Sequence, residues 1–350
     1  MVLVLVSLVA SAVPPAWNAL GLPPSLRRVL DGGDFGATPG GFRAITLSHL
    51  ADGCASRGLA EPTLVEPARA CVTAALHQAL ALHPHHCPRV GSGFVCDVEA
   101  LAAEADPLGL SHLLLVLGAA DRLGPCPDEA LHRALAEALA RQSKDDPWHV
   151  PPSYRKLPLR WPADQSALLA GLARADAAHG TTFHVEPLAG FLATLDAQGT
   201  HRSGLPVSEL TGRGPGARLP RGCAQSFISR YLAEVEPTRT LGWWERYKAG
   251  FFVELPFGIV GFREWPRGVD RQGDVDSGPI VLGIGTAASA LAISAAKANG
   301  DGVLAKRLEA SAEAVMSLGV GSDVVHVPFA EAIRYEARWR PVAPEASSTR

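Results

Sequence analysis

Side chains able to do chemistry are concentrated between Gly261 and Pro279, in a stretch rich in glycine and proline. This stretch holds the runs Arg-Glu-Trp-Pro (263–266) and Asp-Val-Asp-Ser-Gly-Pro (274–279), and an apolar segment follows directly. Acidic, basic and aromatic groups gathered before a helix are typical of a polar pocket rather than of a solvated surface loop. We therefore expect this segment to form one wall of an active site.

Paired carboxyl groups are the chemical tool that this segment offers. A carboxyl group kept protonated by a drier environment can donate a proton, while an ionised partner accepts one. The candidate catalytic residues are three carboxylates and one thiol: Asp276, Glu264, Asp164 and Cys223. Asp276 is the first choice and Glu264 its expected partner, although Glu264 could instead form an ion pair with an arginine. The sequence leaves open whether Asp276 or Asp274 is catalytic and which of the two caps a helix.

Cys223 follows Arg221 and Gly222 at an expected helix start. A helix N-terminus and a nearby arginine both lower the pKa of a thiol, which is how reactive thiolates are produced. A reactive Cys223 is one interpretation. The alternative is a small buried residue without a chemical role.

The residues expected to bind substrate surround these groups, and they are Asp274, Arg263, Trp265, Trp161, Gln165, Arg221, His149 and Tyr154. Aromatic side chains beside proline in the loop 148–154 would suit a sugar face or an apolar ligand, with ordinary loop packing as the alternative. Neither a metal nor a cofactor is expected. His83, His85, His86 and Cys87 lack a second ligand pair at metal-binding spacing. The glycines at 283 and 285 lack the βαβ context of a nucleotide site.

Helices must position these residues, because apolar side chains recur at helical spacing through most of the chain. Expected inner helices start near residues 107, 163, 222 and 279, roughly 57 residues apart, which is a spacing typical of repeated helical hairpins. Long loops alternate with tight turns, so the long loops gather at one end. The pattern predicts an all-α protein, an α/α toroid of five to six helical hairpins with the long loops at one mouth.

Each expected helix start carries a polar cluster, and in a toroid these clusters would meet at the mouth of one cavity. Positive helix ends there would favour carboxylates and anionic ligands. Plain helix capping by Asp and Ser is the alternative. The expected segments are an apolar N-terminus or signal peptide (1–13), an irregular region (14–63), the toroid domain (64–320) and a C-terminal extension and tail (321–350).

Residues 1–13 have the length of a signal-peptide core but lack its positive start, so a buried first strand or helix is the alternative. This apolar run is too short to span a bilayer. Six cysteines are present, and Cys87 and Cys96 flank a glycine-rich turn that makes them the most natural disulfide pair. We expect a secreted or periplasmic protein, with a cytoplasmic one as the alternative. A net charge of −3 without a basic stripe argues against nucleic acid as a partner.

The order of the motifs Trp-Pro-Ala-Asp-Gln (161–165), Arg-Gly-Cys (221–223), 263–266 and 274–279 resembles that of bacterial α/α-toroid proteins. It is similar to six-hairpin glycosidases and to the linalool dehydratase/isomerase group, over roughly residues 100–320. Both resemblances imply acid/base chemistry in a central cavity. The second also implies cysteine as an acid/base group and an exported location.

These observations favour an enzyme, a hydrolase or lyase that uses carboxylate acid/base catalysis on a small-molecule or glycan substrate such as a sugar, a polyol or another hydroxylated compound. A dehydratase or isomerase of an apolar, terpenoid-like alcohol that uses Cys223 is the first alternative. A toroid without activity that binds a glycan or a protein is the second. The sequence does not indicate an oligomeric state.

Overall fold

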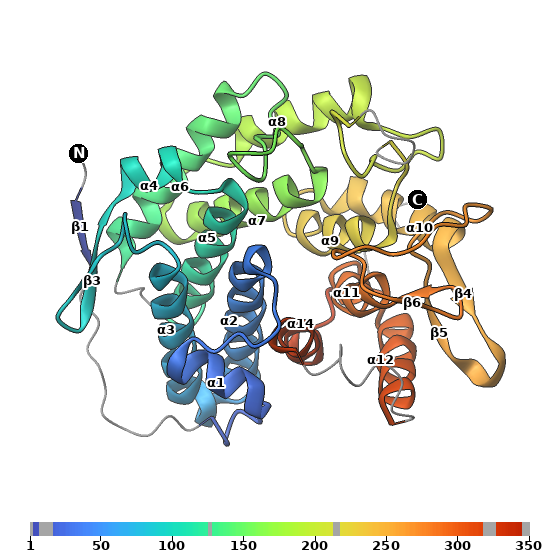
Figure 1. Cartoon of the computed structure of the whole chain (residues 1–350), viewed down its shortest axis with the longest axis horizontal. Coiled ribbons are helices and arrows are strands. Elements are labelled where there is room, and N and C mark those ends of the chain that lie inside the picture. The colour runs from blue at the N-terminus through green and yellow to red at the C-terminus, as the bar shows by residue number, and fades with distance from the viewer. Residues whose placement is uncertain (1–2, 7–16, 125–127, 213–217, 318–326, 345–350) are drawn as a thin grey trace.

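A computed structural model describes residues 3–6, 17–124, 128–212, 218–317 and 327–344, and this part of the chain is mostly helical with a few short strands (Figure 1). The helices are α1 (Pro24–Gly32), α2 (Arg43–Ala60), α3 (Val65–Ala81), α4 (Val98–Glu104), α5 (Pro107–Asp121), α6 (Glu129–Asp145), α7 (Pro162–His179), α8 (Val185–Thr194), α9 (Gly222–Leu232), α10 (Pro237–Phe251), α11 (Thr286–Ala298), α12 (Gly302–Ser317) and α14 (Pro328–Trp339). The strands are β1 (Leu3–Val6), β2 (Arg89–Val90), β3 (Gly93–Asp97), β4 (Phe252–Glu254), β5 (Val260–Phe262), β6 (Ile280–Val281) and β7 (Ile284–Gly285).

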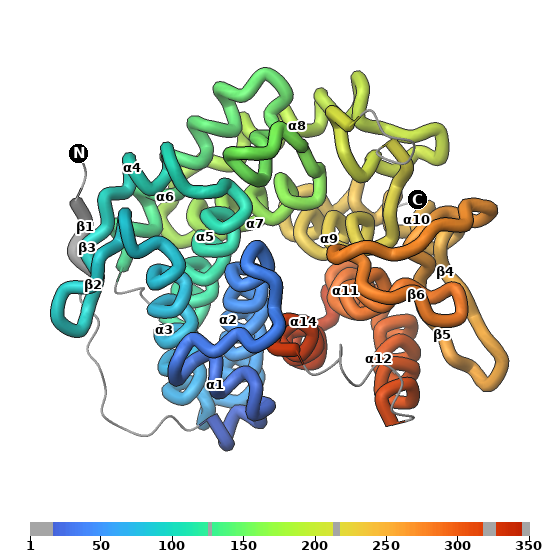
Figure 2. Tube along the Cα trace, viewed as in Figure 1, coloured from blue at the N-terminus to red at the C-terminus, as the bar shows by residue number. Residues whose placement is uncertain are grey.

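Six helices form an inner layer. Helix α2 packs against α5, α5 against α7, α7 against α9, and α9 against α11, while α14 contacts both α11 and α2. Figures 1 and 2 show these six helices grouped around the middle of the molecule. Helices α5 and α7 bury most of their residues on every side, which is characteristic of a helix covered all round.

A second set of helices covers the inner layer from outside. Helix α3 packs on α2 and α5, α6 on α5 and α7, α10 on α9, and α12 on α11. Helix α6 shows why: Leu131, Leu135 and Leu139 form a buried stripe on an otherwise polar helix, so only one face needs a partner. None of the described helices is long and apolar enough to cross a membrane.

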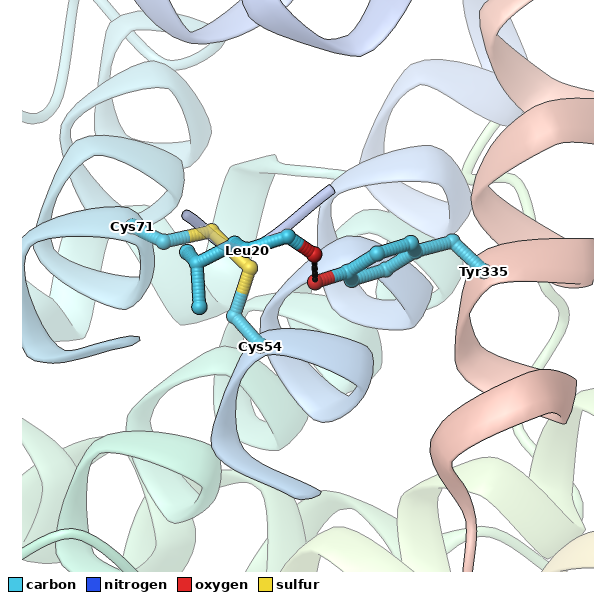
Figure 3. The surroundings of a disulfide bond; sticks show 4 residues. All are labelled: Leu20, Cys54, Cys71 and Tyr335. Atoms are coloured by element: carbon cyan, nitrogen blue, oxygen red, sulfur yellow. Dashed lines mark hydrogen bonds between the residues drawn. A yellow bond between two sulfur atoms is a disulfide. The ribbon is translucent and has the colours of Figure 1, made fainter. Parts of the chain in front are cut away.

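Two disulfides reinforce the N-terminal third. The expected pair Cys87–Cys96 is confirmed, and a second bridge, Cys54–Cys71, joins α2 to α3. Figure 3 shows this second bridge beside Tyr335 of α14, whose hydroxyl donates a hydrogen bond to the carbonyl of Leu20 at 2.9 Å. Two disulfides fit an oxidising environment. Residue 126, the other cysteine of this third, lies outside the described residues.

The segment before α11 differs from the expectation of one helix from Pro279 onward. Ile280–Val281 and Ile284–Gly285 pair as a short antiparallel hairpin, and α11 begins only at Thr286. The turn needs positive φ angles at Leu282 (52°) and Gly283 (80°), a conformation that interrupts a helix and that glycine accepts readily. Asp276 therefore lies in a loop, separated from the inner helix by this hairpin.

The chain ends are more regular than expected. The region 14–63 contains α1 and all of α2, and the region 321–350 contains α14, so two inner helices lie outside 64–320. Of residues 1–13, only Leu3–Val6 is described, and it pairs as strand β1 with β3 in antiparallel register. This agrees with a first strand; the rest of that segment lies outside the described residues.

A largely buried ion network ties several of the inner helices together, and its members are Asp52, Glu234, Glu336, Arg122, Arg174, Arg230 and Arg340. Arg174 of α7 donates to both carboxylate oxygens of Asp52 in α2, at 2.7 and 3.0 Å. Arg230 of α9 is 0 % exposed and donates to Asp52 and Glu234, each at 2.7 Å. Burial acts to raise the pKa of Asp52, but the Arg174 and Arg230 charges outweigh it and the pKa is lower than usual.

We predict that Arg230→Met lowers the free energy of unfolding by about 3–5 kcal/mol, because it removes the fully buried guanidinium that bridges the buried carboxylates Asp52 and Glu336. Urea denaturation followed by circular dichroism measures this. Arg239→Met is the matched control: Arg239 pairs with Asp196 at the surface, and losing it should change stability by less than about 1 kcal/mol. Equal losses in the two variants would contradict a special role for the buried network.

Candidate active site

Glu264 lies directly after strand β5 and is 1 % exposed. Its Oε1 accepts hydrogen bonds from Arg221 Nε at 2.7 Å and from the Cys223 thiol at 3.2 Å, and its Oε2 accepts one from the Cys223 backbone N–H at 3.1 Å. The carboxylate thus caps the first turn of α9, where the helix favours negative charge. Glu264 therefore does form an ion pair, and the same carboxylate contacts the thiol.

Glycine is required between Arg221 and Cys223 for this contact to form. A Cβ atom on Gly222 would lie 2.0 Å from the carbonyl oxygen of Arg263, and the Gly222 N–H donates to the Glu264 carbonyl at 2.8 Å. The start of α9 and the segment after β5 can approach this closely only because no side chain lies between them. The Arg-Gly-Cys motif is explained by this approach.

The Cys223 thiol is less acidic than the sequence suggested. Burial raises its pKa well above the ordinary value, and the Glu264 charge raises it further, while Arg221 acts in the opposite direction. The expectation that the helix N-terminus and Arg221 make a reactive thiolate is wrong, because a carboxylate contacts the sulfur directly. At neutral pH Cys223 is a neutral thiol, which can donate a proton but is a weak nucleophile.

The Asp274 carboxylate stabilises its own loop and is therefore not free to contact a ligand. Its Oδ1 accepts hydrogen bonds from Arg221 Nη2 at 2.6 Å and from the backbone N–H groups of Asp276 and Ser277, both at 3.1 Å. Burial acts to raise its pKa, but the hydrogen bond from Arg221 and that residue's charge outweigh it, so the pKa is lower than usual. Trp265 completes this corner, with the Arg221 guanidinium 5.1 Å from the centre of its ring.

Asp164 lies in the first turn of α7 and is the most strongly perturbed acid of the site. Burial raises its pKa to about 7; the Ser153 hydroxyl acts to lower it, and the Asp276 charge raises it. At neutral pH a substantial fraction of Asp164 is therefore protonated, as a general acid must be.

Asp276 interacts with both the residues around Arg221 and those around Asp164. Loss of solvent around its carboxyl group raises its pKa, Asp274 raises it further, and Arg221 acts in the opposite direction. Its charge also acts on Asp164, Cys223 and Tyr154. No described residue donates a hydrogen bond to the Asp276 carboxylate, so it is available to a ligand.

The remaining expected residues divide into two groups. Tyr154 belongs to the site: burial and then Asp164 and Asp276 raise its pKa to about 12, and its ring meets Trp161 edge to face at 6.0 Å. Arg263 reaches the β6–β7 turn at Gly283, and its buried Nε has no hydrogen-bond partner among the described residues.

The structure does not bring the side chains of Gln165 and His149 to the carboxylates. Gln165 donates to the Ser143 hydroxyl of α6 at 2.7 Å, which joins an inner helix to an outer one. His149 packs on Gly190 of α8, where a Cβ atom would lie 2.3 Å from its ring. Both residues fasten the two helical layers together.

A cavity of about 670 Å³ adjoins the site and shares Tyr154 with it. Sequence analysis missed its charged lining, which includes Arg43, Arg155, Lys156, Glu104 and Asp106. The expected catalytic residues do not line it. Because the cavity lies beside Tyr154, it gives room for part of a substrate next to the carboxylates. The loop 153–157, which belongs to both the cavity and the candidate site, is the one sequence signal that links them.

Comparison with protein-family models and with curated proteins gives no match for this chain.

We predict that Glu264→Gln makes Cys223 more reactive toward iodoacetamide at pH 8. The substitution keeps the shape of the side chain and removes the charge that raises the thiol pKa, so alkylation should accelerate about tenfold for each unit by which that pKa falls. Mass spectrometry of the peptide containing Cys223 gives the rate. Glu254→Gln, at an exposed position in the adjacent β4–β5 hairpin, is the control and should leave the rate unchanged.

We predict that the substitution Asp164→Asn stabilises the protein more at pH 8 than at pH 5. The pKa of Asp164 rises from 3.8 unfolded to about 7 folded, so its ionisation destabilises the native state increasingly as pH rises through this window. The stabilisation by Asp164→Asn should be about 2 kcal/mol larger at pH 8 than at pH 5. This is somewhat less than the full pKa shift implies, because solvent screens part of the charge. Urea unfolding at both pH values measures it, and Asp270→Asn, an exposed residue, should show no such pH dependence.

Proposed function

We propose that this protein is an α/α toroid enzyme that uses carboxyl groups for general acid/base catalysis on a sugar, a polyol or another hydroxylated substrate. The order of contacts among the inner helices supports the toroid, since α14 contacts both α2 and α11. The inner helices α7 and α9 each begin at the candidate site, with Asp164 in the first turn of one and Cys223 in that of the other. This is the arrangement that a ring of hairpins with one mouth would give.

The observation that carries the enzymatic proposal is the raised pKa of Asp164, to which burial contributes most and the Asp276 charge adds. Asp164 has a pKa of about 7, and its neighbour Asp276 is free of hydrogen bonds from described residues. Two neighbouring acids cannot both ionise without repulsion, so one keeps its proton while the other gives it up. Such a pair can protonate a leaving oxygen and take a proton from water or from carbon.

Each residue has a role in this proposal. Asp164 is the general acid and Asp276 the general base, while Asp274 and Arg221 fix the loop that carries the base. Tyr154, Trp161 and Trp265 offer aromatic surfaces to the substrate, and the charged cavity beside Tyr154 holds a further part of it. Whether the reaction is hydrolysis or elimination depends on what the base activates.

The Cys223–Glu264 contact supports a second candidate function, a dehydratase or isomerase of an apolar alcohol. A neutral thiol can donate its proton to a leaving hydroxyl, which departs as water, while the Glu264 carboxylate takes the proton from the adjacent carbon; Arg221 would then offset the charge of the thiolate that remains. For either function, the two disulfides and the absence of a spanning helix among the described residues are consistent with a secreted or periplasmic protein.

We predict that Asp276→Asn lowers turnover by about 10²–10⁴-fold, the usual contribution of a general acid or base. The assay is a panel of neutral and acidic oligosaccharides, polyols and terpene alcohols, followed by chromatography of the products. Asp270→Asn lies in the same exposed loop region, but the Asp270 charge is not among those that act on Asp164, Cys223 or Tyr154, so this variant should retain full activity.

The two catalytic proposals are separated by Cys223→Ser. A sugar-acting enzyme should lose little activity in this variant, whereas a dehydratase that depends on the thiol should lose most of it. Unchanged turnover in Asp276→Asn would remove that residue as base. Saturable binding of a panel compound without any product would instead indicate a toroid that only binds its ligand.

A further inference from the structure

A second polar cluster lies at the far ends of the inner helices, away from the candidate active site. Asp121 is the last residue of α5, His179 is the last residue of α7, and His132 lies in α6 between them. The Nδ1 atom of His132 is 2.6 Å from Asp121 Oδ2 and 3.1 Å from His179 Nε2. One ligand atom from each residue lies within 4.8 Å of the other two.

One hydrogen bond at His132 Nδ1 cannot serve both of its neighbours fully. A ring nitrogen carries either one proton or one lone pair. If His132 Nδ1 donates its proton to Asp121, it has no lone pair left for His179, and if it accepts from His179, it faces the Asp121 carboxylate without a proton. A cation placed among the three atoms would accept a lone pair from each of them.

The chemistry of the three groups fits a transition-metal ion. Two imidazole nitrogens and one carboxylate oxygen are a ligand set that suits zinc, which binds N and O at about 2.0–2.2 Å. Ligand atoms around a tetrahedral zinc are therefore about 3.3 Å apart. The two contacts of His132 Nδ1, at 2.6 and 3.1 Å, lie just below this value, so small side-chain shifts would seat the ion. Because Asp121 and His179 both end helices, the negative ends of two helix dipoles also favour a cation.

The surroundings of His179 provide an independent observation. Its other nitrogen, Nδ1, lies 4.0 Å from a Glu129 carboxylate oxygen, on the side where an outer carboxylate can orient a metal-binding histidine.

We propose that Asp121, His132 and His179 form a structural site for a divalent transition metal, with zinc as the best-suited ion. The metal would join the C-terminal ends of α5 and α7 to α6 and so fasten two neighbouring hairpins. His179 follows Asp164 by fifteen residues in one helix, a separation of about 22 Å at 1.5 Å per residue, so the metal acts on stability and not on the proposed chemistry. Sequence analysis expected no metal, because the three ligands are far apart in the chain and form no ligand motif.

The test uses the full-length protein, dialysed against EDTA and then titrated with Zn²⁺ and, separately, with Co²⁺. We expect one zinc per chain by elemental analysis, a Co²⁺ visible absorption band that Zn²⁺ removes, and a thermal midpoint that rises by a few degrees with Zn²⁺. His179→Gln and the nearly isosteric Asp121→Asn should each lose the bound zinc and the thermal shift. A double variant of the exposed loop, His85→Gln with His86→Gln, should keep both.

The proposal is overturned if the wild-type protein takes up no zinc, or if the loop variant loses the metal while His179→Gln keeps it. Should both ligand variants fail to fold, X-ray absorption of the zinc-loaded wild-type protein decides, since two imidazoles and one carboxylate give a distinct coordination shell. A shell made of any other set rules the site out. These outcomes do not depend on turnover, so they are separate from the test of the catalytic proposal.

Discussion

The ion network around Asp52 and Arg230 is the interaction on which the inner layer most depends. Asp52 and Arg230 are 178 positions apart in the chain, and the network also joins α7 and α14. Charges removed from water are tolerated only when they are paired and hydrogen-bonded. Displacing any one of these helices would leave an unpaired buried charge, so the network selects one arrangement of the inner helices from the many that apolar packing alone would accept.

The same helices carry a cluster rich in arginine at one level and a cluster rich in carboxylates at another. In the network, three carboxylates meet four arginines, and the pKa values of Asp52, Glu234 and Glu336 are lowered. At the candidate site one arginine pairs with two carboxylates, and no described basic side chain pairs with Asp164 or Asp276. The proposed acid/base chemistry would use the charge repulsion in the second cluster, and stability supplied by the first can offset it.

Local signals made part of this structure predictable. Proline and glycine at the first turn place the starts of α5, α7 and α9 within one residue of the expected positions. The start of α11 was missed, because a two-residue turn at Leu282 and Gly283 converts an apolar helix pattern into a hairpin. The direction of the Cys223 pKa shift was also missed, since it depends on Glu264, which is distant in the chain and arrives only through tertiary packing.

Helix α14 is synthesised late but packs against one of the first helices of the chain. It is the last described helix, yet it contacts α2 near the beginning of the chain, and its Tyr335 hydroxyl bonds to the carbonyl of Leu20, 315 residues earlier. The inner layer therefore cannot be completed until α14 has been synthesised. Until then, the faces of α2 and α11 that α14 covers stay exposed on the nascent chain, and exposed apolar surface of this kind is prone to aggregation.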